Sequence, residues 1–457
     1  MWISEYSFFD FDSESILCKE PILSHYLRMI QTPVAIIGMA KSGQSAERLL
    51  LASGHKKEDV LTFDQKAPAQ FSDPLELINK GRPKTLVISP GVPLKSSWIV
   101  EAQKSGIIIT SEINLACEYL ANEKIIGVTG SLGKSTTVSL LGAGVTAFDK
   151  NAFVGGNLGT PFCEYAYGIV TGKRPRAQWI ILELSSYQLE NCKSLHLDHS
   201  VITFLSANHM ERYEHLEDYY LTKWRIVDKT KKTLFLNKNG GHLLMFAKKQ
   251  SEFSRCRVVS SEDSDLAPYS LSQSALLGSH NQDNIALAAQ IALQCHWPLS
   301  SIKAMKTFQG LEHRLENMGF FNGVRYINDS KATALDSVLT AVEVAHKYLS
   351  PLATLHVLLG GRNKNLPWEE LIPLGNLSGI KFLFFGECKE IASTKSQLLG
   401  PQFAKLEEAV TYVMGQAKSD DIVLLSPGGT SLDEFKGFED RGRFFKEKVN
   451  SFYLKKK

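Results

Sequence analysis

Short apolar runs alternate with amphipathic stretches along most of the chain, and this alternation predicts its strands and helices. The runs form three series, at residues 34–38, 59–64, 85–91 and 106–110, then 124–130, 179–184 and 201–206, then 324–329, 354–361, 381–386 and 421–429. Apolar runs separated by helical segments are typical of parallel strands that helices cover on both faces. The pattern therefore predicts an α/β fold.

The three series predict three consecutive α/β domains. The chain has 457 residues, which is enough for several cores because a domain usually has about 100–200 residues. We expect a Rossmann-like N-terminal domain at 1–110, a central P-loop ATPase domain at 111–310 and a Rossmann-like C-terminal domain at 311–457.

Composition and charge limit the classes of partner that the protein is expected to bind. Lys and Arg number 51 against 48 Asp and Glu, a formal charge of +3, and this balance speaks against a nucleic-acid scaffold. No apolar stretch has the length of a membrane span, and acidic side chains precede the first basic residue, Lys19, unlike a secretory signal. The seven cysteines lack zinc-ligand spacing and are typical of reduced thiols. We expect a cytoplasmic monomer that binds small molecules, without nucleic acid or membrane insertion.

A glycine-rich segment after the run at 124–130 has the context of a phosphate-binding loop. It reads GVTGSLGKSTT from Gly127 to Thr137 and opens a helical stretch. In such a loop backbone N–H groups bind phosphates, Lys134 would reach the terminal ones and Ser135 would bind Mg²⁺. Val128 occupies the first glycine position of the strict motif, so an incidental Lys-Ser is the alternative. We favour ATP or GTP binding.

A weaker glycine fingerprint follows the first run. It spans Gly38 to Gly43, and Asp64 ends the next run about where a ribose-binding carboxylate falls in a dinucleotide-binding unit. Ser42 and Asp64 are candidate contacts of a nucleotide moiety. A structural turn with a capping aspartate explains the same residues equally well.

Two polar positions follow central runs and could converge with the phosphate loop. Glu183 ends the run at 179–184, and His209 follows the run at 201–206. The carboxyl ends of parallel strands share one edge of a sheet, and oxygen and nitrogen ligands beside phosphates suit Mg²⁺ or Mn²⁺. Alone, each residue is explained by capping or a loop hydrogen bond; together with the phosphate loop we favour ligands.

Lys223 lies on an apolar stripe of the helix predicted after His209. Desolvation lowers the pKa of an amine, which gives a reactive or modified lysine. The alternative is that the methylenes pack while the ammonium reaches water. From the helix pattern alone, the second interpretation is preferred.

Nine motifs occur in order in the central and C-terminal regions. They are GVTGSLGKSTT, GGNLGTP (155–161), ELSSYQLE (183–190), NHMERY followed by Lys223, HNQDN (280–284), GLEHRLE (310–316), NDSKAT (328–333), LLGGRNK (358–364) and LLSPGGTSLDEFKGFEDRG (424–442). Together they resemble the ATP-dependent Mur ligases of peptidoglycan synthesis. ELSSYQLE, NDSKAT and the last motif resemble the members that add D-glutamate.

The resemblance implies an amide ligase that joins D-glutamate to UDP-N-acetylmuramoyl-L-alanine through an acyl phosphate, in the cytoplasmic synthesis of peptidoglycan precursors. It implies ATP and Mg²⁺ or Mn²⁺ as cofactors. The implied catalytic residues are Lys134, Glu183, His209, Lys223 and Lys331, and the implied metal ligands are Ser135, Glu183, His209 and Lys223 as a carbamate.

The resemblance also assigns the binding residues. Those implied for ATP are Gly130, Gly133, Lys134, Ser135, Thr136, Asn281, Asn284, Arg314 and Asp329. Those implied for the substrates are Asn157 and, in the D-glutamate pocket, Thr333, Lys364, Ser431, Leu432 and Phe438, beside Ser42 and Asp64 for the UDP moiety. Without their motifs, Lys364 would read as a solvated lysine, and Asn281 and Asn284 as helix caps.

Several positions depart from the family pattern. Leu132 replaces an Asn of the phosphate loop, Tyr187 a Phe, Ala334 an Asn, and Gly428-Gly429-Thr430 a run of the Ala-Cys-Ala type. We expect the two glycines to loosen the D-glutamate loop.

Three other functions remain to be weighed. A sibling ligase, including a folylpolyglutamate synthase, would share the mechanism but not NDSKAT and the last motif. A non-catalytic nucleotide-binding protein would have lost Lys134, Glu183, His209 or Lys223, and all four are present. A P-loop switch protein would need switch segments rather than two further domains that supply substrate groups.

Overall fold

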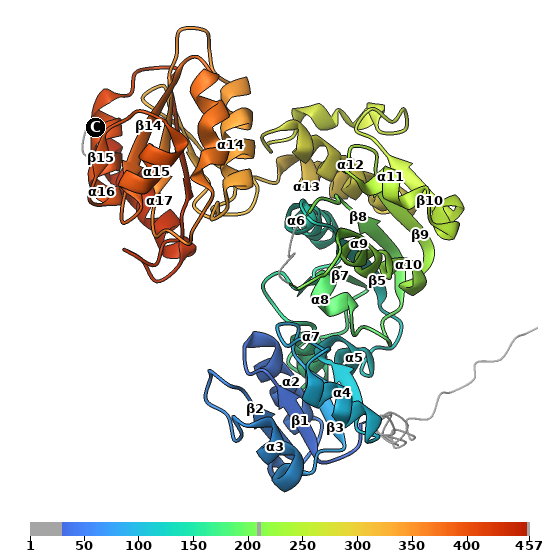
Figure 1. Ribbon diagram of the computed structural model, residues 1–457. Coiled ribbons are helices and arrows are strands. Elements are labelled where there is room, and N and C mark those ends of the chain that lie inside the picture. The colour runs from blue at the N-terminus through green and yellow to red at the C-terminus, as the bar shows by residue number, and fades with distance from the viewer. Residues whose placement is uncertain (1–29, 208–211, 455–457) are drawn as a thin grey trace, which may run out of the picture. The chain divides into compact units, whose positions relative to one another are not determined.

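The computed structural model describes residues 30–207 and 212–454 and contains three sheets flanked by helices (Figure 1). Each predicted series of runs forms one sheet, so the prediction of three α/β domains is confirmed. The chain separates after Leu120 into two compact units, 1–120 and 121–457. The first unit extends past residue 110 because its last helix, α5 (Glu112–Cys117), packs against α2 (Lys41–Ala52). The boundary expected at 310 lies inside the second unit and stays a prediction.

The first sheet is parallel throughout, with strand order β2-β1-β3-β4. All four predicted runs form its strands. They are β1 (Val34–Ile37), β2 (Val60–Phe63), β3 (Thr85–Ile88) and β4 (Ile108–Ser111), accompanied by α3 (Pro74–Glu76), η2 (Leu77–Gly81) and α4 (Ser97–Lys104). Alternate strand residues, such as Ala35 and Ile37, pack in its hydrophobic core.

The second sheet has six parallel strands in the order β10-β9-β8-β5-β7-β6. Its strands are β5 (Lys124–Thr129), β6 (Phe153–Gly156), β7 (Trp179–Glu183), β8 (Leu197–Ile202), β9 (Thr230–Asn237) and β10 (Cys256–Val259). The sequence patterns predicted β5 and β7, missed β6, β9 and β10, and placed β8 four residues late because its first half contains His199 and Ser200.

Helices cover this second sheet. They are α6 (Lys134–Thr146), α7 (Phe162–Val170), α8 (Ser186–Leu189), α9 (Leu216–Trp224), α10 (Ile226–Lys229), α11 (Leu243–Ala247), α12 (Ser279–Gln294) and α13 (Leu299–Thr307). Helices α6, α12 and α13 pack against one another, and their apolar residues form one core with β5 and β7.

The third sheet has the strand order β11-β12-β16-β13-β14-β15, and only its edge strand β11 is antiparallel. Its strands are β11 (Glu316–Phe321), β12 (Val324–Asn328), β13 (Leu355–Gly360), β14 (Ile380–Phe385), β15 (Gln402–Phe403) and β16 (Ile422–Gly428). The four predicted runs are confirmed as β12, β13, β14 and β16; β11 and β15 were missed.

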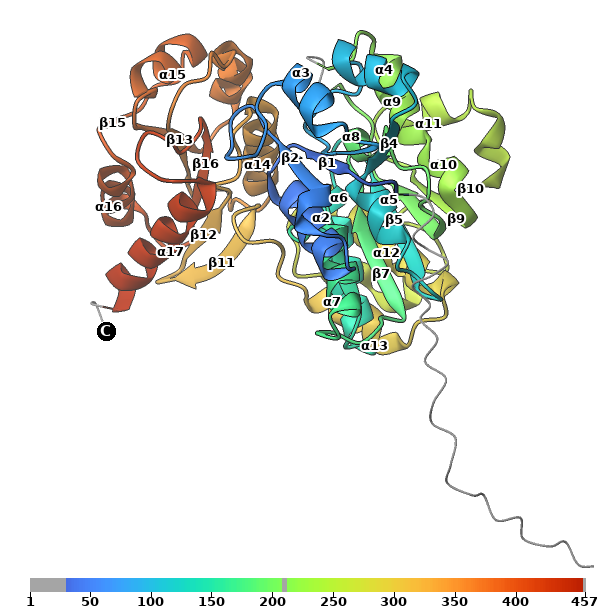
Figure 2. The same ribbon diagram turned by 90° about the horizontal axis from the view of Figure 1, so that it is seen from below.

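The third sheet has a core on each face (Figure 2). Along β16, Ile422 and Leu424 face one core and Val423 and Leu425 the other, because successive strand residues point to opposite faces. The helices on the first face are α14 (Leu335–Lys347), η6 (Trp368–Asn376) and α15 (Lys389–Ser396), and those on the second are α16 (Leu406–Gln416) and α17 (Phe438–Leu454).

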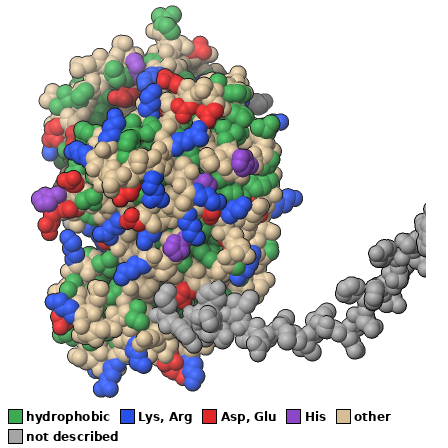
Figure 3. All heavy atoms as spheres, turned by 90° about the vertical axis from the view of Figure 1, so that its right-hand side faces the viewer, with side chains coloured by type: hydrophobic (Ala, Val, Ile, Leu, Met, Phe, Trp, Pro, Cys, Tyr) green, Lys and Arg blue, Asp and Glu red, His purple; other side chains and the backbone are tan. Residues whose placement is uncertain are grey.

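Surface charge and hydropathy agree with the composition. On the face seen in Figure 3, Lys and Arg side chains are interspersed with Asp and Glu. Within 30–207 and 212–454, no helix is both long and apolar enough to span a bilayer. The six cysteines in the described ranges form no disulfide with one another.

Leu424 offers a test of the third core because its side chain is fully buried in the central strand. We expect Leu424→Ala to lower the free energy of unfolding by about 2–5 kcal/mol through the cavity it leaves. The matched control is Leu352→Ala, since Leu352 is 101% exposed and its change should stay within about 0.5 kcal/mol. Urea unfolding measures both, and equal effects would contradict the packing described.

Candidate active site

The phosphate loop connects β5 to α6 as predicted. Gly130 has a φ of +150°, and a Cβ there would lie 2.1 Å from Thr203 Oγ1, so only glycine fits this turn. Gly133, with a φ of +81°, is the N-cap residue of α6. Lys134 and Ser135 therefore begin the helix, where free N–H groups and the helix dipole favour a bound anion.

Hydrogen bonds to the segment after β8 hold the phosphate loop in place. Thr203 Oγ1 donates hydrogen bonds to the Thr129 and Leu132 carbonyls, and Ser131 N donates to the Phe204 carbonyl at 2.7 Å. Ser131 Oγ donates to the Ser206 carbonyl at 3.0 Å. The loop conformation is thus fixed from outside the loop.

Glu183 lies at the carboxyl end of β7 beside this loop and is 2% exposed. Its Oε1 accepts a hydrogen bond from Asn157 Nδ2 at 2.7 Å, whereas Oε2 is buried and has no hydrogen-bond partner among the described residues. A buried carboxylate oxygen without a partner is unfavourable unless a ligand completes it. Glu183 therefore fits the role of cation ligand, and Asn157 orients it.

Lys134 and Lys223 share one acceptor. Lys134 Nζ donates to the Gly130 carbonyl at 2.7 Å, and Lys223 Nζ donates to the same oxygen at 2.9 Å. Burial lowers the pKa of Lys134 and holds the pKa of Lys223 well below its usual range, where the charge of Lys134 lowers it further. Lys223 is 1% exposed. The preferred interpretation from the helix pattern, an ammonium that reaches water, is therefore wrong.

The charge of Glu183 reaches four basic side chains. Burial lowers the pKa of each, and the Glu183 carboxylate opposes that shift in every case; they are Lys134, Lys223, Arg314 and Lys331. Two come from the central region and two from the C-terminal region. The second unit therefore assembles one strongly basic site around one carboxylate.

The described residues fit Mg²⁺ in part. Ser135 is buried at the start of α6 and Glu183 offers a free oxygen, and oxygen ligands are those that Mg²⁺ prefers. His209 lies outside the described residues. Among the residues that are described, no three His, Cys, Asp or Glu side chains form a metal cluster.

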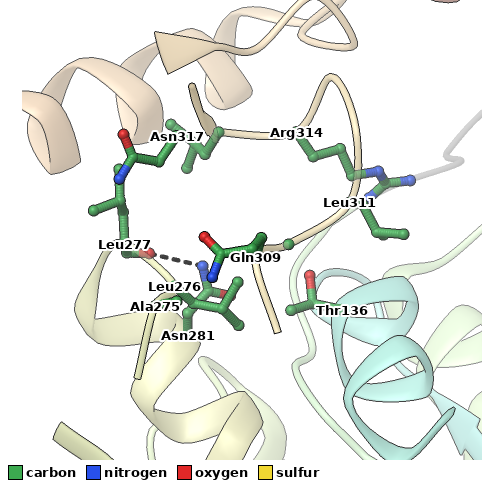
Figure 4. A pocket seen from close by; sticks show the side chains of 11 residues that line it. Thr136, Ala275, Leu276, Leu277, Asn281, Gln309, Leu311, Arg314 and Asn317 are labelled. Carbon is green, nitrogen blue, oxygen red and sulfur yellow. Dashed lines mark hydrogen bonds between the residues drawn. The ribbon is translucent and has the colours of Figure 1, made fainter. Parts of the chain in front are cut away.

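A pocket beside the phosphate loop has a volume of about 310 Å³ including its mouth (Figure 4). Thr136 at the start of α6 lies across it from Asn281, and Arg314 borders it from the opposite loop. Asn281 Nδ2 donates to the Leu277 carbonyl at 2.7 Å. Three of the residues implied for ATP are thus brought together.

Asn284 does not line this pocket. Its Nδ2 donates to Asn281 Oδ1 at 3.0 Å, and its Oδ1 accepts from the Thr137 hydroxyl at 3.2 Å. Asn284 thereby connects the pocket wall on α12 to the phosphate-loop helix α6. The Asn284 side chain, which the family resemblance implied for ATP binding, therefore hydrogen-bonds Asn281 and Thr137 in this structure.

Asp329 supports the loop that carries Arg314. Its Oδ1 accepts from Leu315 N at 3.1 Å, and its Oδ2 accepts from Ser426 Oγ at 2.9 Å. Burial raises the pKa of Asp329 to about 7, although these hydrogen bonds oppose the shift.

The residues implied for the D-glutamate pocket lie on loops at one edge of the third sheet. Thr333 follows β12, Lys364 follows β13, and Ser431 and Leu432 follow β16. Backbone hydrogen bonds in both directions between Arg362 and Thr430 join the last two loops. Ser431 is buried, whereas the other three are exposed.

Phe438 begins α17 at the same edge. The Lys331 ammonium lies 4.6 Å from the centre of its ring, a distance at which cation and ring attract. Burial and then Arg314 lower the pKa of Lys331. The structure thus places an implied pocket residue against an implied catalytic lysine.

In the first unit, Asp64 braces the glycine turn. Its Oδ2 accepts from Met39 N at 2.7 Å, and its Oδ1 accepts from Lys66 N and Ala67 N. These backbone hydrogen bonds lower its pKa. Ser42 is half-buried at the start of α2. The structural interpretation of Asp64 is thereby supported, and a nucleotide contact stays a prediction.

Sequence reasoning missed most of the pocket wall. The residues to which it gave no role are Ala275, Leu276, Leu277, Gln309, Gly310, Leu311, Leu315 and Asn317. Gly310, Leu311 and Leu315 lie inside the GLEHRLE motif, and the signal of the others is proximity to that motif or to HNQDN. Ser131 lies in the phosphate-loop motif, but its hydrogen bonds to the segment after β8, like those of Thr203 to the loop, could not be predicted because the partners are distant in sequence.

Comparisons with known proteins identify relatives of this chain. A family model described as the Mur ligase middle domain matches residues 128–293. The UDP-N-acetylmuramoylalanine–D-glutamate ligase of Syntrophus aciditrophicus (strain SB) is 31% identical over 91% of this chain and 97% of its own length. The protein of the same name from Pasteurella multocida (strain Pm70) is 33% identical over 90% of this chain and 96% of its own.

Solved structures share the fold. The MurF ligase from Thermotoga maritima in complex with ADP has a TM-score of 0.55 at 14% identity, over 93% of this chain and 97% of its own. The UDP-N-acetylmuramate-alanine ligase from the same organism has a TM-score of 0.54 at 15% identity, over 92% of this chain and 100% of its own.

The raised pKa of Asp329 predicts a pH dependence of stability. The folded protein holds this proton more tightly than the unfolded chain, so the stability it contributes is present below about pH 4 and is lost as the pH rises through 7. We expect Asp329→Asn to gain stability over the wild type between pH 4 and 8, by at most about 4 kcal/mol at about 1.4 kcal/mol per pKa unit. Urea unfolding at several pH values measures the difference, and a constant difference would contradict the assignment.

Proposed function

The chain belongs to the Mur ligase family, and from this premise we propose that it joins D-glutamate to UDP-N-acetylmuramoyl-L-alanine with cleavage of ATP to ADP and phosphate. The observation that carries the proposal is the pair of lysines, Lys134 and Lys223, on the Gly130 carbonyl of the phosphate loop. The charge of the buried Glu183 reaches both of them, as well as Arg314 and Lys331. A site this basic suits the phosphates of ATP and the carboxylate to be activated. The names of the relatives supply the substrates.

The reaction has two chemical steps. A carboxylate oxygen of the L-alanine residue attacks the terminal phosphorus of ATP, the bond to ADP breaks, and an acyl phosphate forms. The nitrogen of D-glutamate then attacks the acyl carbon, loses a proton, and phosphate leaves. Both steps build charge on oxygen atoms, and preorganised cations stabilise such charge.

Each group of residues has a part in this scheme. The loop N–H groups of 130–136 and Lys134 bind the phosphates, and Thr136, Asn281 and Arg314 border the nucleotide. Asn284 and Asp329 hold the walls of that site. Lys331 serves the reaction centre, and the D-glutamate contacts are Thr333, Lys364, Ser431, Leu432 and Phe438.

The remaining assignments complete the proposal. Ser42 and Asp64 serve the UDP moiety, and Asn157 serves the substrate by orienting Glu183. The domains divide near residues 110 and 310. The protein is a cytoplasmic monomer of peptidoglycan precursor synthesis.

Mg²⁺ or Mn²⁺ would be held by Ser135, Glu183, His209 and a carbamate on Lys223, and would neutralise charge on the phosphoryl oxygens. The carbamate forms when the neutral amine of Lys223 adds carbon dioxide: a nitrogen–carbon bond is made and a proton is released. Burial favours the neutral amine, and the described structure gives Lys223 no ion-pair partner. Modification would turn the buried neutral amine into an anion near three basic side chains, those of Lys134, Arg314 and Lys331.

Phosphate release tests the function. Purified protein with ATP, Mg²⁺ and UDP-N-acetylmuramoyl-L-alanine receives D-glutamate, L-glutamate, meso-diaminopimelate, L-lysine or no amino acid. We expect release that depends on D-glutamate. Release with another amino acid would keep the mechanism and overturn the substrate, whereas binding of ATP without release would indicate a non-catalytic protein.

Lys223 provides a second test. We expect Lys223→Ala to lower kcat by about 10³-fold or more, as for the loss of a residue that acts directly on the transition state, and short carboxylic acids to restore part of it. The control is Lys231→Ala, which removes an exposed lysine and should leave the rate and its response to these acids unchanged. Loss of activity without rescue would count against the carbamate.

A further inference from the structure

Arg441 is a fully buried arginine to which the proposed mechanism gives no role. It lies in the first turn of α17, and none of its side chain is exposed. Its Nε donates to Ser330 Oγ at 3.1 Å, one terminal nitrogen donates to the Ser330 carbonyl at 2.8 Å, and the other donates to the Gly429 carbonyl at 3.1 Å. All its acceptors are uncharged.

A buried cation without a counter-ion is costly to a folded protein. Within the described chain no carboxylate lies within ion-pair distance of Arg441, and the charge that raises its pKa most, that of Asp433, acts over longer range. Burial lowers the pKa of Arg441 to about 10, so the side chain stays charged at neutral pH. The guanidinium is therefore held by hydrogen bonds to backbone and hydroxyl oxygens, and its role depends on the segments that these bonds connect.

The acceptors belong to two loops at the carboxyl edge of the third sheet. Ser330 follows β12 and directly precedes Lys331, the lysine at the proposed reaction centre. Gly429 follows β16 and directly precedes Thr430 and Ser431 of the proposed D-glutamate loop. One planar guanidinium bridges both loops, which is a geometry that lysine cannot supply.

Neighbouring contacts leave this bridge little freedom. Ser330 Oγ also donates to the Phe438 carbonyl at 2.8 Å. A Cβ at Gly361 would lie 2.8 Å from a terminal nitrogen of Arg441 and 2.3 Å from the Thr430 carbonyl. The loop after β13 thus packs against the same guanidinium.

The next residue of α17 extends the bridge to a third loop. A Cβ at Gly442 would lie 2.1 Å from His313 Nδ1, so the helix touches the His313 ring. The His313 carbonyl accepts a hydrogen bond from Lys331 N at 3.0 Å. The start of α17 therefore contacts both segments that flank Lys331.

We propose that Arg441 is a positioning residue, whose guanidinium fixes the loop of Lys331 to the loop of Thr430 and Ser431 and so sets the distance between the amino-acid pocket and the reaction centre. The inference rests on the proposed function, because it takes D-glutamate to bind at these loops. Misplacement of a bound reactant by about 1 Å can lower a rate by about 10²-fold.

Steady-state kinetics of Arg441→Ala test the proposal. We expect KM for D-glutamate to rise at least about tenfold, while KM for ATP, whose phosphate loop lies on the second sheet, changes less than about threefold. Arg441→Lys keeps the charge but not the fork and should raise KM for D-glutamate similarly. The matched control is Arg443→Ala, since Arg443 is two residues away on α17, 56% exposed and paired with Asp440.

Chemical rescue separates positioning from folding. Guanidinium ions at millimolar concentration should lower KM for D-glutamate of Arg441→Ala toward the wild-type value, and ammonium ions should not.

If Arg441→Ala fails to fold, Ser330→Ala is the second variant. It keeps the arginine and removes the hydroxyl that links it to Phe438, and it should raise KM for D-glutamate by a smaller factor.

Two outcomes would overturn the inference. One is a kcat that falls only in proportion to the folded fraction measured by circular dichroism, with both KM values unchanged. The other is equal increases in both KM values. Wild-type protein that releases no phosphate with D-glutamate would instead contradict the proposed function, so the two failures are distinguishable.

Discussion

One backbone carbonyl, that of Gly130, accepts hydrogen bonds from two lysines, the buried Lys223 and the half-buried Lys134, and the candidate active site depends on this contact. The turn at Gly130 aims the oxygen into the site, and Thr203 leaves no room for a side chain there. Two amines on one oxygen repel each other when both are charged, which favours a neutral Lys223. Arg314 and Lys331 add further positive charge, so the site is matched to anions that the protein itself does not contain.

The second and third sheets hold their functional loops in the same way. In each, buried polar side chains hydrogen-bond the loops at the carboxyl ends of parallel strands to another segment. Thr203 and Ser131 join the phosphate loop to the segment after β8, and Arg441 joins two loops on the third sheet. Buried polar groups that are fully hydrogen-bonded favour one loop conformation. Hydrogen bonds within the protein thus position the loops of both halves of the site.

The sequence was sufficient to predict the three sheets and most of the strands that lie inside them. Several strands escaped detection because their patterns are weak. The edge strand β6 ends in two glycines, the edge strand β15 has two residues, and β9, which lies inside the second sheet, begins with Thr-Lys-Lys-Thr. Lys223 shows the same limit within the site. Helical spacing placed it on an apolar face, but its acceptor lies 93 residues earlier in the chain. Motifs identified which residues matter, while their partners depend on packing that local patterns do not encode.

The glycines after β16 show how packing reverses an expectation from sequence. Gly428 and Gly429 were expected to loosen the D-glutamate loop. A Cβ at Gly429 would lie 2.6 Å from the Gly360 carbonyl, and one at Gly428 would lie 3.1 Å from the Trp368 ring. The glycines are thus required by the close approach of the loops after β13 and β16, which lets Arg362 and Thr430 pair and brings the Gly429 carbonyl to Arg441. Residues that would loosen an isolated loop tighten this one, because they allow neighbouring backbones to touch.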